Sequence, residues 1–186
     1  MKRKMRIAPI DIDHATEEQK EVLGPWRTPE GRIYNLFATF VKHPKLLRRW
    51  YPYGMHVMTK STLSDRDREI VIMRIAYLNN SDYEWGHHRM IANRIGLTDE
   101  DLARVIEGAE ADGWNDIDRM LIRAVDEMKV SASLSDEVYD GLADHYSEKQ
   151  VMDLVHTYGA YNLVSTCLNV FGVQLEDDVP GLEKFQ

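Results

Sequence analysis

Residues 64–96 read SDRDREIVIMRIAYLNNSDYEWGHHRMIANRIG and predict two helices joined by a short turn. Ser64 and the acidic residues after it suit a helix N-terminus, and the following residues are rich in Ile, Val and Met. The two asparagines at 79–80 mark the turn. The second helix covers about residues 81–95 and ends at Gly96, which accepts the left-handed backbone of a helix C-terminus. The stretch therefore predicts a helical hairpin with antiparallel helices.

Helix signals continue along the rest of the chain, and strand-like alternation of apolar and polar residues is absent. Apolar residues at intervals of three and four predict a helix over about 33–41, and Pro52 is expected to kink or break the helix that starts at Pro44. Capping signals predict further helices over about 16–23, 98–108, 116–129 and 135–145, and a long last helix from residue 147. The sequence thus predicts an all-α fold of about seven or eight helices.

The length and composition indicate one folded domain over residues 1–186. This length suits a single hydrophobic core, and 44% hydrophobic with 29% charged residues is near the average for globular chains. We place the helical core at about 32–176, with an N-terminal extension over 1–31 and an acidic, solvated C-terminal tail over 176–186. The net charge of −8 argues against a nucleic-acid partner, which requires a basic surface.

Cysteine usage and the character of the N-terminus predict a cytoplasmic protein. The one cysteine, Cys167, cannot form a disulfide within the chain. Residues 1–6 are basic, as in a signal peptide, but no apolar core follows them. Residues 154–175 contain no Asp, Glu, Lys or Arg, yet their His, Tyr, Asn and Gln side chains are too polar for a lipid-spanning helix. We interpret this segment as a helix buried in protein and expect no membrane partner.

The densest group of ionisable side chains lies at the start of the second hairpin helix. Ser81, Glu84 and His88 are three and four residues apart and share one helix face, which continues as an apolar stripe. Glu69, on the first helix, lies about as far from the turn as His88, so the two side chains are placed to meet across the hairpin. A buried Glu–His pair can hold a proton near neutral pH. The alternative interpretation is a structural pair that only satisfies a histidine.

These residues resemble the carboxymuconolactone decarboxylase and alkylhydroperoxidase-D-like superfamily. The resemblance is carried by residues 61–72, by Tyr83-Glu84-Trp85 with His88, and by Gly96-Leu97-Thr98. It covers about residues 35–176. In the peroxidase branch a Glu is followed, on the next helix, by Cys-x-x-Cys-x-x-x-His. Glu69 falls on that Glu, and His88 falls on that His.

The resemblance also implies which chemistry is lost. The two cysteine positions of the peroxidase branch fall on Ser81 and Glu84, and neither side chain forms a thiolate or a disulfide. This departure points to the decarboxylase-like branch, whose members act without metal or organic cofactor. The resemblance therefore implies a cofactor-free carbon–carbon lyase, a carboxy-lyase of aromatic catabolism, that acts on a small carboxylated or lactone-type metabolite.

The cluster provides the groups that such a reaction needs. Decarboxylation requires an electron sink, which a lactone carbonyl provides, and a proton donor. His88, Glu84 and Glu69 are the predicted catalytic residues, as proton donor, base and orienting partner. Substrate contacts are expected from Ser81, Tyr83, Trp85 and His87. The same groups suit isomerisation, dehydration or lactone opening, so the sequence leaves the reaction type open.

Other interpretations remain open on the sequence alone. The first is an alkylhydroperoxidase-like peroxide reductase, and the second is a non-catalytic, oligomeric protein that binds a small molecule. A third is a di-metal site, because Glu84-x-x-His87 and Asp153-x-x-His156 have the spacing of di-iron ligands. Further Glu ligands on facing inward stripes are not evident, so we predict no metal site.

The uncharged last helix also predicts self-association. A helix so free of charge exceeds what one small domain covers. Its polar side chains can either reach a ligand or pack between subunits, and we expect the second role for His156, Tyr158, Tyr161 and Asn162. The resemblance implies trimers or hexamers. The expected partners are therefore a small-molecule substrate and further copies of the chain.

Overall fold

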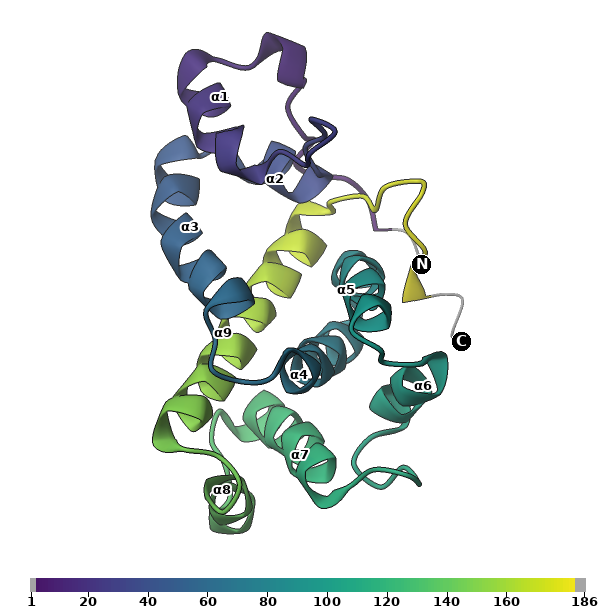
Figure 1. The fold of residues 1–186 in the computed structure, drawn as a ribbon. Coiled ribbons are helices and arrows are strands. Elements are labelled where there is room, and N and C mark those ends of the chain that lie inside the picture. The colour runs from purple at the N-terminus through teal and green to yellow at the C-terminus, as the bar shows by residue number, and fades with distance from the viewer. Residues whose placement is uncertain (1–2, 183–186) are drawn as a thin grey trace.

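The computed structural model describes residues 3–182. Within this range the regular elements are nine α-helices and two short 3-10 helices, η1 (Ile12–His14) and η2 (Gly24–Trp26). The α-helices are α1 (Glu17–Leu23), α2 (Asn35–Phe40), α3 (Pro44–Thr59), α4 (Asp65–Leu78), α5 (Asp82–Arg94), α6 (Asp99–Glu107), α7 (Asp116–Ser131), α8 (Asp136–Ala143) and α9 (Glu148–Phe171) (Figure 1). The all-α prediction is confirmed, with one helix more than the upper expected number.

Helix α4 is the centre of the fold. It packs against α5, α6, α7 and α9, which surround it in Figure 1. Nine consecutive residues of α4, 68–76, are buried. A helix that is hydrophobic on all sides belongs in a protein interior, and the Ile, Val and Met run of α4 has this character. The main core therefore forms around the first helix of the predicted hairpin.

The hairpin of α4 and α5 forms as predicted. The Ser64 side chain accepts a hydrogen bond from the backbone N–H of Asp67 and caps α4. The turn is closed by a hydrogen bond from the N–H of Ser81 to the C=O of Ala76. It contains Asn80 with φ 47°, a left-handed conformation that Asn adopts more readily than most residues. The short turn places α5 directly against α4.

Helix α3 does not break at Pro52. It runs without interruption from Pro44 to Thr59, although the proline removes one backbone donor inside the helix. The helix packs against α1 and α9. Its buried residues Leu47 and Val57 lie on opposite sides of Pro52 along the chain. Packing on both sides of the proline favours one continuous helix, so the expected break is absent.

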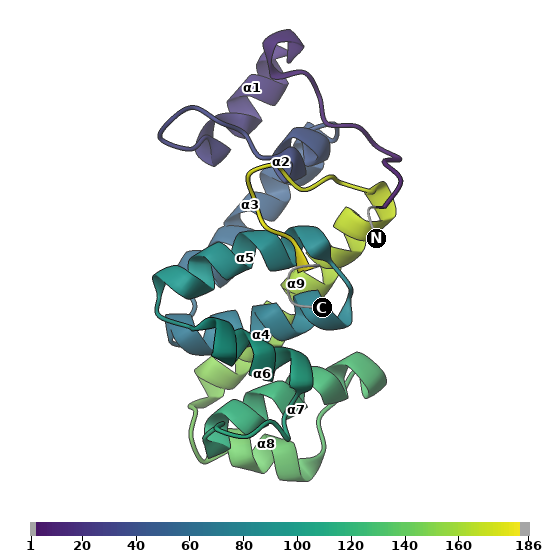
Figure 2. The same cartoon turned by 90° about the vertical axis from the view of Figure 1, so that its right-hand side faces the viewer.

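The segment before α3 forms a small cap at one end of the molecule (Figures 1 and 2). A separate hydrophobic cluster joins α1, α2 and the start of α3. Its members are Val22, Leu23, Val41 and Leu47, with Trp26, Phe37 and Trp50 among the residues packed against them. Trp26 stacks on Phe37 with ring centroids 3.8 Å apart. We refer to residues 17–40, from α1 to α2, as the N-terminal cap.

The segment after α9 runs back along α5 instead of ending in solvent. Figure 2 shows residues 173–182, which we call the C-terminal strap, in yellow beside α5. Val179 and Pro180 approach Gly86 so closely that a Cβ at this position would lie 2.9 Å from atoms of both. Glu176, Val179 and Leu182 of the predicted solvated tail are therefore buried, whereas Asp177 and Asp178 are exposed. Residues 183–186 of that tail lie outside the described residues.

Helix α9 is buried on one side only. Its inner side packs against α3, α4, α5 and α8. Exposed apolar side chains at helical spacing occupy the other side, namely Met152, Val155, Leu163 and Val170. The prediction of a helix buried in protein is thus correct for one face of α9 within this chain. None of the helices in residues 3–182 is long and apolar enough to cross a membrane.

Candidate functional site

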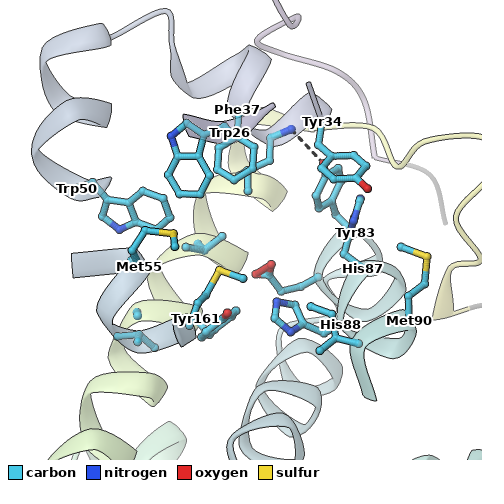
Figure 3. Close-up of a pocket in the computed structure, with 18 of the residues that line it drawn as sticks. Trp26, Tyr34, Phe37, Trp50, Met55, Tyr83, His87, His88, Met90 and Tyr161 are labelled. Atoms are coloured by element: carbon cyan, nitrogen blue, oxygen red, sulfur yellow. Dashed lines mark hydrogen bonds between the residues drawn. The ribbon is translucent and has the colours of Figure 1, made fainter. Parts of the chain in front are cut away.

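A cavity of about 410 Å³ lies between the N-terminal cap and α5, a size that suits a small molecule. Its aromatic and apolar walls come from the cap, α3 and α9, and most of its ionisable side chains come from α5. Figure 3 shows the rings of Trp26, Phe37 and Trp50 on one side of this space, with His88 and Tyr161 opposite them. The site is therefore an apolar chamber with one polar wall.

One face of α5 forms that polar wall. The lining residues Glu84, His87, His88, Ile91 and Arg94 form rows with steps of three or four positions, so they share one side of the helix. The ionisable groups lie at the end near the turn of the hairpin, and Arg94 lies at the other end, where it is exposed. The sequence predicted the polar end of this stripe.

His88 and Glu69 form a buried hydrogen-bonded pair. Nδ1 of His88 lies 2.8 Å from Oε2 of Glu69, so the two residues meet across the hairpin as predicted. Both side chains are buried. Arg68 lies on the other side of the carboxylate, with its Nε 3.6 Å from Oε1 of Glu69. Because Nδ1 is engaged, Nε2 is the ring nitrogen left to exchange a proton with a ligand.

Glu84 lines the cavity one helical turn before His88. It is buried, and its Oε2 has no hydrogen-bond partner within the described residues. Burial raises the pKa of the Glu84 carboxyl to about 7; the charge of His88 opposes this rise and the charge of Glu69 adds to it. Glu84 can therefore gain or lose a proton at neutral pH.

Opposing effects act on the His88 imidazole. Burial lowers its pKa, but the charge and hydrogen bond of Glu69 raise it, and Glu84 adds to the rise. The result is a pKa above the ordinary value of 6.5. Glu69 therefore stabilises the imidazolium form relative to a free imidazole, which suits His88 as a proton donor.

Tyr161 lies edge-on to His88, with ring centroids 4.8 Å apart and an interplanar angle of 90°. It is buried and lines the cavity. Burial raises the pKa of its phenol well above 10, so the hydroxyl keeps its proton at neutral pH. The expected packing of Tyr161 between subunits is corrected by this position, because its ring faces the site inside the chain.

His87 and Tyr83 form a second polar group at the cavity, together with Glu176 of the C-terminal strap. Nε2 of His87 lies 2.6 Å from Oε2 of Glu176. The Tyr83 hydroxyl donates a hydrogen bond of 3.0 Å to Oε1 of the same carboxylate. His87 and Tyr83 were both predicted at the site, and both line the cavity. Glu176 was missed, since nothing in the acidic end of the sequence distinguishes it from its neighbours.

Ser81 and Trp85 lie away from the cavity. Both are fully buried, and neither is among the residues that line it. Trp85 belongs to the main core, because it points about 100° around the helix from Glu84. The direct substrate contacts expected of Ser81 and Trp85 do not fit this placement. Trp26 of the cap provides an aromatic wall that no sequence pattern indicated.

Asp153 and His156 do not join the group on α5. Asp153 accepts hydrogen bonds from the backbone N–H and hydroxyl of Thr62, at 2.6 and 2.7 Å, and lies 3.3 Å from Nε2 of His56. His156 contacts the ring of Tyr53 instead. Across residues 3–182, no group of three His, Cys, Asp or Glu side chains is arranged to hold a metal ion. The Glu84–His87 unit and the Asp153–His156 unit, which have di-iron spacing in the sequence, therefore lie in different surroundings in the fold.

Residues 44–127 match the model of the carboxymuconolactone decarboxylase family. The match extends from the start of α3 into α7, and it includes the hairpin that carries Glu69, Glu84 and His88. Over this segment the chain is similar to the carboxymuconolactone decarboxylase family. No protein of curated function matches its sequence. The resemblance stated from the sequence is thereby confirmed.

Solved structures share the fold of this protein over nearly the whole chain. An uncharacterized peroxidase-related protein from Silicibacter sp. TM1040 gives a TM-score of 0.78 at 14% identity and covers 96% of both chains. An uncharacterized peroxidase-related protein with an alkylhydroperoxidase AhpD core, from Ralstonia eutropha JMP134, gives 0.77 at 17% identity, over 94% of this chain and 95% of that one. A variant of the debrominase Bmp8, in complex with 2,3,4-tribromopyrrole, gives 0.72 at 17% identity and covers 95% of both chains.

At these identities the likeness establishes the AhpD-like fold. The similar structures are described as peroxidase-related proteins and a debrominase, so one fold carries more than one kind of reaction. The reaction of this protein must therefore be argued from its own side chains.

Proposed function

We propose that the protein is a cofactor-free carboxy-lyase that releases CO2 from a small lactone-type acid by acid–base chemistry. The observation that carries the proposal is the buried group of Glu69, Glu84 and His88 at the wall of an otherwise apolar cavity. Ionisable groups with raised pKa values gather at functional sites more often than elsewhere. The group also lies within the segment that matches the decarboxylase family.

The proposed reaction breaks the bond between the carboxylate carbon and the ring. CO2 leaves, and the bonding electron pair moves into the conjugated lactone carbonyl, which forms an enolate. The His88 imidazolium, or protonated Glu84, then delivers a proton to carbon. Glu69 holds the imidazole through Nδ1 and stabilises its charged form. The lactone loses CO2 and gains one proton, and water restores the proton on the donor.

The opening of the cavity suits an anionic substrate. Arg27 and Arg94 both line the cavity, and Arg94 is exposed. Within residues 3–182, Arg94 forms no ion pair. A guanidinium group binds a carboxylate through two parallel hydrogen bonds. We propose that a carboxylate which the reaction retains binds at this opening, while the ring of the substrate contacts Trp26 and Trp50.

The peroxidase-related neighbours make a thiol peroxidase the second candidate, but this chain lacks the nucleophile at the site. Ser81 and Glu84 stand at the positions that the resemblance assigns to cysteines. Cys167 lies on α9 and is not among the cavity residues. Burial raises the pKa of the Cys167 thiol, which disfavours the reactive thiolate. These features support the lyase over the peroxidase.

Release of CO2 from carboxymuconolactone is the direct test. The wild-type protein is expected to release CO2, measured by NMR with a carbon-13 carboxylate, and to show no turnover of cumene hydroperoxide with dithiothreitol. Peroxide turnover that disappears in Cys167→Ser, without CO2 release, would replace the lyase by a peroxidase. Binding of the lactone without any turnover would instead support the non-catalytic binding protein.

We propose in addition that the exposed stripe on α9 packs against a second copy of the chain. Light scattering is then expected to give a mass several times 21.6 kDa, as in the trimer or hexamer that the resemblance implies. Leu163→Glu, in the middle of the stripe, is expected to reduce this mass. Val130→Glu, at an exposed apolar residue on α7, serves as the control and leaves the mass unchanged. A wild-type monomer at micromolar concentration would contradict the proposal.

A further inference from the structure

A second histidine–carboxylate pair faces the same cavity as the pair of His88 and Glu69. His87 lines the cavity, its side chain is 14% exposed, and its Nε2 lies 2.6 Å from Oε2 of Glu176. Consecutive helix residues point about 100° apart, so the two imidazoles occupy neighbouring but separate positions on the cavity wall. Helix α5 thus presents two imidazoles, each bonded to a carboxylate from another segment.

Glu176 is held in its ionised form. Its Oε1 accepts hydrogen bonds from the backbone N–H of Asn35 at 2.7 Å and from the Tyr83 hydroxyl at 3.0 Å. Burial raises the pKa of Glu176, but the hydrogen bonds from His87 and Asn35 outweigh burial and lower it. A carboxylate accepts and cannot donate, so the His87 nitrogen that faces it carries the proton. Nδ1 is therefore the His87 nitrogen with a lone pair when the ring is neutral.

Two aromatic rings fix the His87 imidazole in this orientation. The Tyr83 ring stacks on it with centroids 4.6 Å apart at 27°, and the Tyr34 ring meets it edge-on at 4.7 Å and 75°. Figure 3 shows Tyr34, Tyr83 and His87 together on one side of the cavity. Tyr83 also donates to Glu176, so the stacked ring and the carboxylate hold His87 as one unit.

The two pairs leave opposite ring nitrogens for a ligand. His88 is bonded through Nδ1 and leaves Nε2, whereas His87 is bonded through Nε2 and leaves Nδ1. The surroundings of His88 favour its protonated form, which donates. Glu176 holds His87 in the tautomer whose lone pair is on Nδ1, as the carboxylate of a catalytic triad does for its histidine. One group can therefore take a proton while the other gives one.

We propose that His87, positioned by Glu176, is a general base of this site, and that the site also acts on unsaturated lactones or acids in which a proton moves between two carbon atoms. The inference rests on the proposed function, because it uses the same cavity with His88 as donor. Nδ1 of His87 removes a C–H proton next to the carbonyl, and the electron pair forms an enolate. His88 then protonates the far carbon of the conjugated system. The double bond shifts, no atom is lost, and exchange with water resets both imidazoles.

Nitrogen-15 NMR of histidine-labelled protein tests the orientation of His87. Neutral His87 is expected to carry its proton on Nε2 in the wild type. Glu176→Gln introduces an amide that can donate to Nε2, so the Nδ1–H form is expected to appear. Asp11→Asn alters the exposed pair of His14 and Asp11 and leaves the His87 signals unchanged. Wild-type His87 with its proton on Nδ1 would overturn the proposal.

Deuterium exchange tests the chemistry. α-Angelica lactone, an unsaturated lactone with a CH2 group next to its carbonyl, is expected to exchange those protons when it is kept with the wild-type protein in D2O, followed by proton NMR. Carboxymuconolactone is supplied to the same protein samples in parallel. His87→Gln is expected to slow this exchange by about 10²-fold or more. Glu176→Gln is expected to slow it less, because only the fraction of the protein with the His87 proton on Nδ1 lacks the lone pair there. Wild-type exchange rates in His87→Gln, or no exchange by the wild type, would refute the base role.

Measurement of CO2 on the same samples separates this inference from the lyase proposal. Exchange by the wild type without CO2 release would exclude the lyase and leave the base role of His87 in place. Release of CO2 with exchange unaffected by His87→Gln would exclude the base role and leave the lyase in place.

Discussion

Replacing His88 by glutamine is expected to lower kcat for CO2 release from carboxymuconolactone by about 10²–10⁴. Glutamine is similar in size and can still hydrogen-bond Glu69, but it has no proton that titrates near neutral pH. KM is expected to change much less, because the aromatic walls that contact the substrate remain. Steady-state kinetics of both proteins at several pH values measure the effect, and the acidic form of the wild type should be the active one.

His14 offers a matched control for this variant. It forms another histidine–carboxylate pair, 2.7 Å from Asp11, but the pair is exposed and does not line the cavity. His14→Gln is therefore expected to keep the wild-type kcat. A purely structural role for His88 predicts a loss of about 1–3 kcal/mol in the free energy of unfolding, with kcat per folded molecule retained. That pattern, measured by unfolding and kinetics on the same samples, would rule out His88 as the proton donor.

The hairpin at the centre of the fold could be predicted because its signals are local. Ser64 caps α4 within three residues, and the turn and Gly96 lie next to the helices they end. The sequence left open whether Pro52 kinks or breaks its helix, because the outcome depends on packing along both halves of α3, which the local sequence does not contain.

The candidate site also contains some contacts that the sequence predicts and others that it does not. The contact between Glu69 and His88 was predictable, because a short turn fixes the register of two antiparallel helices. The hydrogen bond between His87 and Glu176 joins residues 89 positions apart, and no spacing rule relates them. Trp26 reaches the cavity through the N-terminal cap, whose position depends on packing between distant segments. Sequence patterns therefore could not predict the contacts between segments that lie far apart in the sequence.

Replacing Glu84 by glutamine is expected to stabilise the protein at about pH 8 by up to roughly 3 kcal/mol, with little effect near pH 4. The folded-state pKa of Glu84 is about 7 against an ordinary value of 4.5. Between these values the folded protein binds more protons than the unfolded chain, so the free energy of unfolding falls as the pH rises. Glutamine stays neutral at every pH, so the free energy of unfolding no longer falls through the ionisation of residue 84.

His88 contributes to the same trend over a different range of pH. Its pKa is raised in the folded protein, so its pairing with Glu69 stabilises the fold fully below about pH 6.5. This contribution is lost as the pH rises through the folded-state pKa. Glu84→Gln is therefore expected to abolish the fall in stability between about pH 4.5 and 6.5, while the part due to His88 persists above that range.

Urea unfolding at a series of pH values measures both contributions, with Glu18→Gln as the control at an exposed glutamate on α1. The control is expected to follow the wild-type curve. If Glu84→Gln also follows it, Glu84 titrates like an exposed carboxyl and has no place in proton transfer. A gain in stability at alkaline pH, accompanied by lost turnover, would instead show that the fold tolerates a destabilising buried acid because the reaction requires its proton.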